Sequence, residues 1–230
     1  MATNDLHERN VAEIVQKANE FLGPILDESG TVLYSSCETL KPGKYYFLGL
    51  NPGGSEEGTT KIRQSLVDLD TSTLNAYLDE SWCSDPDCKG CRPLQKSFKF
   101  LFEELGEDPY TVCASNLIFK RSRDEGDARY PELAELCWPV HEAILQVVQP
   151  HTIITFGDKT FRFVAKQLGG GSVQYFDSGH GNWACQSLIK KGSPSLIGLP
   201  HLSKYALYNH REVVEKIRSL IQIGPCPPTV

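Results

Sequence analysis

Short apolar runs alternate with amphipathic stretches along most of the chain. An opening amphipathic helix is predicted to end at Gly23-Pro24. Four apolar runs predict buried strands, at 45–50, 110–118, 151–156 and 195–199. Apolar positions at helical spacing predict helices between and after them, at 94–105, 131–149, 158–168 and about 203–222. Because such strands indicate a parallel sheet covered on both faces, we predict a three-layer α/β/α sandwich around a central, mainly parallel four-stranded sheet.

One segment departs from this alternation of strand and helix. Residues 173–191, VQYFDSGHGNWACQSLIKK, predict a β-hairpin that turns at SGHGN. Elsewhere the glycines and prolines punctuate the chain without forming a linker, and no repeat is present. A length of 230 residues with no break in composition predicts a single domain over 1–230, with a cysteine-containing insertion around 80–93.

Composition narrows the class of protein. The chain is 40% hydrophobic and 23% charged, and no stretch approaches the roughly 18 apolar residues of a membrane span. The polar start, MATNDLHERN, resembles neither a secretory signal nor a transit peptide. We therefore expect a soluble, intracellular protein of the cytoplasm or nucleus that acts as a monomer. A net charge of -6 argues against sequence-independent wrapping of nucleic acid but allows a local basic patch.

The eight cysteines divide into two groups. Five are scattered singly, and in a reducing compartment we expect most of them to be buried free thiols: Cys37, Cys113, Cys137, Cys185 and Cys226. The other three, Cys83, Cys88 and Cys91, are close enough in sequence to share a metal, and C-x-x-C is a common half-site for zinc or an iron–sulfur cluster. Two interpretations stay open: a structural metal completed by a distant cysteine or an aspartate, or reduced thiols in an irregular insertion.

Polar residues or glycines follow each predicted strand. Asn51 comes after the first strand, Asn116 lies near the end of the second, Gly157 and Asp158 follow the third, and His201 follows the fourth. Parallel sheets bind ligands at the carboxyl ends of their strands. These residues are therefore the candidates for a functional site.

The same segments resemble the uracil-DNA glycosylase superfamily. GLNPGG (49–54) resembles its first signature, G-x-[DN]-P, and PHLSKYAL (200–207) resembles its second, which carries a histidine and a serine two places later. VCASNLIFKRSR (112–123) resembles the strand with the base-reading asparagine, and QPHTIITFGDKTFRFV (149–164) the third strand with its glycine turn. The matches span about 45–210. Asparagine at 51 is closest to the mismatch-specific and single-strand-selective branches, whereas Leu202 stands where the family usually has proline.

This resemblance implies a monofunctional DNA glycosylase that removes uracil or another deaminated base from DNA, with no cofactor required for the chemistry. In the implied mechanism the Asn51 amide oxygen orients a water, His201 donates to the departing base and Asn116 reads it. Two further sets follow from the resemblance: base-pocket residues Gly49, Leu50, Pro52, Gly53 and Phe98, and DNA-holding residues Leu202, Ser203, Lys204 and Tyr205.

Each candidate also has a structural interpretation. Asn51-Pro52-Gly53 is a common turn sequence, Asn116 fits a satisfied strand-end amide, and Phe98 fits core packing at least as well as base stacking. The main alternative function is a protein of the same fold that binds nucleic acid or a nucleotide without catalysis. A small-molecule hydrolase is a third possibility, but the sequence has neither a G-x-S-x-G turn nor a P-loop.

Overall fold

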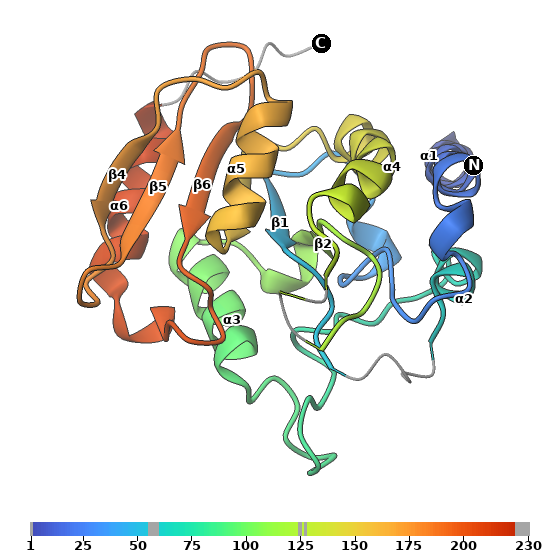
Figure 1. Cartoon of the computed structure of the whole chain (residues 1–230), viewed down its shortest axis with the longest axis horizontal. Coiled ribbons are helices and arrows are strands. Elements are labelled where there is room, and N and C mark those ends of the chain that lie inside the picture. The colour runs from blue at the N-terminus through green and yellow to red at the C-terminus, as the bar shows by residue number, and fades with distance from the viewer. Residues whose placement is uncertain (1, 55–59, 124–125, 127, 224–230) are drawn as a thin grey trace.

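A computed structural model describes residues 2–54, 60–123, 126 and 128–223 (Figure 1). Its α-helices are α1 (Ala2–Phe21), α2 (Ile62–Val67), α3 (Pro93–Leu105), α4 (Glu132–Val148), α5 (Asp158–Gln167) and α6 (Arg211–Ile223). Its strands are β1 (Tyr45–Gly49), β2 (Cys113–Asn116), β3 (Thr152–Phe156), β4 (Gln174–Asp177), β5 (Ala184–Leu188) and β6 (Ser195–Leu199).

The strands form one mixed sheet in the order β2-β1-β3-β6-β5-β4. Neighbouring strands from β2 to β6 pair in parallel, and β6, β5 and β4 pair antiparallel. The four predicted buried strands are therefore present and make up the parallel part. The expected count of four was wrong, because the sheet of the described residues has six strands.

The two additional strands come from the predicted hairpin. Its second strand, β5, pairs with the outer edge of β6, with Ser187 opposite Ile197. Its first strand, β4, forms an edge of the sheet and is mostly exposed. The sequence pattern indicated the hairpin, but half-polar strands carry no signal that selects a partner strand. The pairing of β5 with β6 is therefore decided by tertiary contacts.

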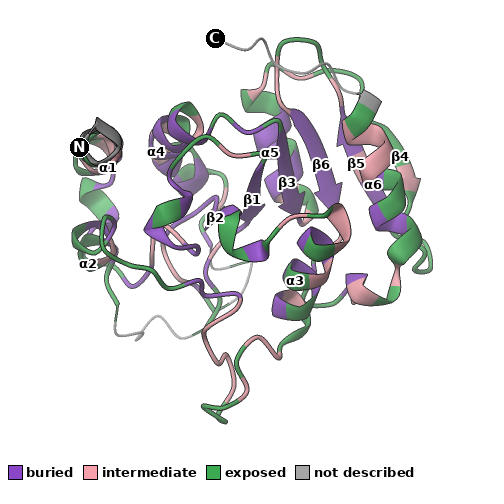
Figure 2. Ribbon diagram, turned by 180° about the vertical axis from the view of Figure 1, so that it is seen from behind, coloured by how far each residue is buried: buried purple, intermediate pink, exposed green. Residues whose placement is uncertain are grey.

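Helices cover both faces of the sheet. Alternate residues of β1 point to opposite faces: Tyr46 and Leu48 join one apolar cluster with α1, α4 and α5. Tyr45 and Phe47 join the other cluster with α3 and α6. Figure 2 shows the strands β1, β3 and β6 buried between these helical layers. The sheet is thus the middle layer of an α/β/α arrangement.

Most helices agree closely with the sequence prediction, and α3 shows why. Pro93 occupies the first turn, the Gln95 side chain accepts a hydrogen bond from the Arg92 backbone N–H at 3.1 Å, and Gly106 ends the helix with φ of 82°. The last helix differs: it begins at Arg211, eight residues after the expected start at 203. The residues predicted as its first turns form a loop instead. The buried residues of this loop are spaced along the sequence much as they would be in a helix.

A histidine of α4 lies in the core and faces β1. His141 is fully buried, its Nε2 lies 3.1 Å from the Leu117 carbonyl, and its Nδ1 lies 2.7 Å from the Tyr46 hydroxyl. A carbonyl only accepts, so Nε2 carries the proton and Nδ1 accepts from Tyr46. Burial lowers the pKa of His141 from its ordinary 6.5 to about 4, so the ring is neutral near pH 7.

We predict that His141 makes the fold sensitive to mild acid. Between pH 6.5 and 4 the unfolded chain binds one more proton at this residue than the folded chain does, so stability falls as pH falls. Its contribution is about 1.4 kcal/mol per pH unit and about 3 kcal/mol in all. In urea unfolding, the stability gap between wild type and His141→Gln should shrink by that amount from pH 7 to pH 4. Parallel pH profiles for the two proteins would contradict this account.

Candidate functional site

The parallel strands bring the predicted site residues to one edge of the sheet. β1 and β3 are neighbours in the sheet, and the chain leaves β1 toward β2 on one side but leaves β3 toward β4, β5 and β6 on the other. In open α/β sheets such a switch point leaves a crevice outside the carboxyl ends of the strands. Gly49, Asn116, Phe156 and Leu199 are the last residues of the four parallel strands and lie at this edge.

Asn51 is held by the turn that follows β1. Its Nδ2 donates to the carbonyl of the buried Pro52 and to the Ser122 hydroxyl, both at 2.8 Å. Ser122 also donates its backbone N–H to the Pro52 carbonyl at 3.0 Å, which ties the two loops together. Because both Nδ2 hydrogens are used, Oδ1 is the amide atom left to accept from water. The sequence offered no signal for Ser122.

Asn116 lies directly against β1. It is paired with Gly49 in the sheet and is only 4% exposed. A Cβ on Gly49 would lie 2.3 Å from Asn116 Oδ1 and 2.5 Å from the Phe156 ring, so only glycine leaves room for both. No hydrogen bond from the Asn116 carboxamide to another described residue is present. Because the carboxamide atoms are not fully buried, they can meet water or a ligand at this edge of the sheet.

His201 adjoins this group through Phe156. The two rings meet edge to face with centroids 5.5 Å apart, and the left-handed Gly157 packs beside the imidazole. Both the Ser203 backbone N–H, at 3.3 Å, and the Ser203 hydroxyl, at 2.7 Å, contact Nδ1 of His201. A backbone N–H only donates, so Nδ1 accepts and Nε2 carries the ring proton. This tautomer places the ring N–H on the side of the imidazole away from Ser203.

A cavity of about 360 Å³ opens beside His201. Leu50 lines it from the end of β1, and residues 157–160 line it from the start of α5. Lys204 and Trp183 complete the wall on the side of the hairpin. Asn51 and Asn116 do not line this cavity, although Leu50, which precedes Asn51, does. The structure thus brings Gly49, Asn116 and His201 together around Phe156, and it holds Asn51 through Pro52 and Ser122.

Three predicted contact residues are buried. Phe98 is fully buried, and its ring stacks on Tyr77 with centroids 4.4 Å apart, so it is a core residue and presents no face to a base. Leu202 and Tyr205 are also fully buried, and neither side chain reaches the surface. Core packing accounts for all three, because their ring or alkyl surface fills the apolar cluster under α3 and α6. Ser203 and Lys204, from the same loop, are exposed.

Only some of the basic residues that follow the strands lie near the site. Lys190 and Lys191 follow β5, which runs antiparallel to β6, so they lie at the opposite edge of the sheet. Lys120 pairs with Glu28 at 3.3 Å, and the Arg121 guanidinium donates to the Gly53 carbonyl. Lys204, together with Lys159 from α5, is the positive charge that lines the cavity.

The thiol trio lies in the irregular segment before α3. A bridge between Ser81 and Lys89 folds this segment back, and hydrogen bonds with Cys91 and then Cys83 raise the pKa of the Cys88 thiol to about 12. Among the residues that the structure describes, no group of three His, Cys, Asp or Glu side chains is arranged to hold a metal. The zinc or iron–sulfur site therefore stays a prediction. Cys37, Cys113, Cys137 and Cys185 are buried free thiols as expected, and Cys226 lies outside the described residues.

Comparison with known proteins adds no assignment. No protein-family model matches the sequence, and no curated protein matches it either. Among the helices of the described ranges, none has the length and apolar character needed to cross a lipid bilayer.

We predict that Gly49 is required by the packing of the site. In Gly49→Ala the new methyl group must displace Asn116 or Phe156, which should cost about 1 to 3 kcal/mol of unfolding free energy in urea titrations. The matched control is Gly53→Ala, where an added Cβ meets nothing within 4 Å. That variant should stay within about 0.5 kcal/mol of wild type. Equal stability of the two variants would show that the close approach at Gly49 is not tight.

Proposed function

We propose that the protein is a monofunctional DNA glycosylase that hydrolyses the bond between a deaminated base, such as uracil, and its sugar. The observation that carries the proposal is the Asn116 carboxamide. It is nearly buried, is unpaired within the described part of the chain, and is connected through Phe156 to an imidazole with its proton on Nε2. An amide supplies a donor and an acceptor together, as the imide-like edge of uracil requires.

In the proposed chemistry, Asn51 and His201 each act where one of the two charges of the reaction develops. Breaking the glycosidic bond leaves cationic character on the sugar and negative charge on the base. Asn51 Oδ1 orients a water toward the sugar, since its Nδ2 is fixed by Pro52 and Ser122. An amide cannot accept a proton at neutral pH, so it positions the water and does not act as a general base. His201 donates from Nε2 to the base oxygen where negative charge develops.

A second candidate function is binding of an extruded base without catalysis. The cavity beside His201 favours it, because that cavity is lined by neither Asn51 nor Asn116. Leu202 in place of the family's proline also changes the loop that would hold the DNA backbone. Tight binding of a uracil-containing strand without an abasic product would establish this alternative over the glycosylase.

We predict that Asn51→Ala and His201→Ala each lower the excision rate about 100-fold or more while the fold stays intact. The assay is single-turnover cleavage of labelled oligonucleotides that contain uracil, hypoxanthine, xanthine or a thymine mismatch, with alkali to cut abasic sites. Circular dichroism and urea unfolding report whether each variant is folded.

The control for this experiment is His151→Ala. His151 is exposed and precedes β3, at the edge of the sheet opposite His201, so its removal should leave the rate unchanged. Wild-type rates in both site variants would overturn the assignment of Asn51 and His201. No abasic product from any of the substrates with wild-type protein would overturn the glycosylase proposal itself.

A further inference from the structure

The tip of the β4–β5 hairpin lies at the same edge of the sheet as the candidate site. β5 runs antiparallel to β6, so the tip, residues 178–183, lies beside the loop that follows β6. Trp183 and Ala184 line the cavity together with His201 and Lys204. The hairpin is therefore a wall of the site as well as the end of the sheet.

Hydrogen bonds fix the conformation of the tip. The buried Ser178 hydroxyl donates to the Trp183 carbonyl at 2.7 Å and accepts from the His180 backbone N–H at 3.2 Å. Asp177 accepts from the Gly179 backbone N–H at 2.9 Å. Gly179 and Gly181 have φ of 70° and 55°, values that glycine adopts without strain. The position of Trp183 is thus set by the turn itself.

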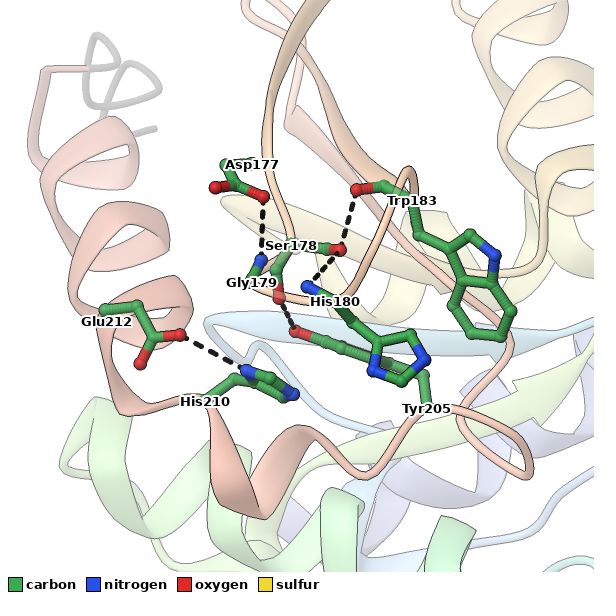
Figure 3. Close-up of polar contacts among 8 residues, drawn as sticks. All are labelled: Asp177, Ser178, Gly179, His180, Trp183, Tyr205, His210 and Glu212. Atoms are coloured by element: carbon green, nitrogen blue, oxygen red, sulfur yellow. Dashed lines mark hydrogen bonds and ion pairs between the residues drawn. The ribbon is translucent and has the colours of Figure 1, made fainter.

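Tyr205 anchors the tip to the loop after β6. Its hydroxyl donates to the Ser178 carbonyl at 2.5 Å, and Figure 3 shows the ring extending beneath the hairpin. The opposite side of the network is closed by His210, which stacks on Tyr205 with centroids 4.9 Å apart and contacts Glu212 at 3.2 Å. Tyr205 is thus a buried support, whereas Trp183 presents an indole ring to solvent.

Trp183 combines exposure with nearby positive charge. Trp183 is 40% exposed, and its ring packs on one side against His180 with ring centroids 4.9 Å apart. Lys204 and Lys159 line the same cavity. Asp158, the carboxylate in the cavity wall, is engaged by Arg162 at 2.8 Å and by Gln186 at 3.1 Å. An aromatic face beside lysines is the arrangement that binds an unstacked base together with its phosphate.

We propose that Trp183 is a stacking platform for a nucleobase of single-stranded DNA next to the candidate site, and that Lys204 and Lys159 contact the adjoining phosphates. This inference rests on the proposed function for the identity of the ligand as DNA. It assigns to the hairpin the contact with the bases that the buried Leu202 and Tyr205 cannot make. It also specifies the substrate as a strand whose bases are already unpaired.

The test uses short oligothymidine strands without any lesion, so that it reports binding alone. Fluorescence anisotropy of a labelled strand should give a dissociation constant that rises about 5- to 150-fold in Trp183→Ala, while Trp183→Phe keeps most of the affinity. The strand should quench the intrinsic tryptophan fluorescence of wild type, and Trp183→Phe should remove most of this change.

The matched control is Tyr175→Ala. Tyr175 lies on β4 of the same hairpin and is 67% exposed, but it does not line the cavity, so its removal should leave strand affinity unchanged. Equal affinities of wild type and Trp183→Ala, an equal loss in Tyr175→Ala, or no strand binding by wild type would each overturn the platform. If the protein excises uracil but Trp183 does not affect strand binding, the stacking platform is wrong and the glycosylase proposal stands. If strand binding depends on Trp183 but no base is excised, the glycosylase proposal is wrong and the stacking platform stands.

Discussion

Parallel pairing of β2, β1, β3 and β6 is the constraint on which the rest of the molecule depends. Because the four strands point the same way, residues separated by up to about 150 positions of sequence end at one edge. Parallel strands are buried on both faces, so helices must cover them, and the two apolar clusters follow from that requirement. The site lies at this edge because the connections that leave the neighbouring strands β1 and β3 run to opposite sides of the sheet.

Two kinds of side chain share the edge, and they serve different purposes. Phe156 is a buried spacer whose ring contacts both Gly49 and His201. Ser122 and Ser203 are polar supports: one fixes the amide of Asn51 and the other sets the proton of His201. Polar side chains held by such supports keep one orientation when a ligand arrives, which lowers the entropy cost of binding.

Sequence reasoning predicted the parallel core because its strands are short, apolar and separated by well-bounded helices such as α3. It also placed Asn51, Asn116 and His201 at strand ends, since the position of a residue after a strand can be read along the chain. It did not predict that β5 pairs with β6, because pairing depends on partners far away in sequence. Nor did it separate buried from exposed aromatic residues: Phe98 and Tyr205 became core, whereas Trp183 reached solvent.

The two edges of the sheet differ in what lies against them. At the β2 border, the Tyr34 backbone N–H donates to the Ala114 carbonyl at 2.8 Å, and the Ser35 hydroxyl accepts from the Ala114 N–H at 3.0 Å. That border is thus occupied by an earlier segment of the chain. At the other border stands β4, a strand of four residues that ends at Asp177. A strand this short offers few unpaired backbone groups, so the hairpin leaves the sheet only a short open edge there.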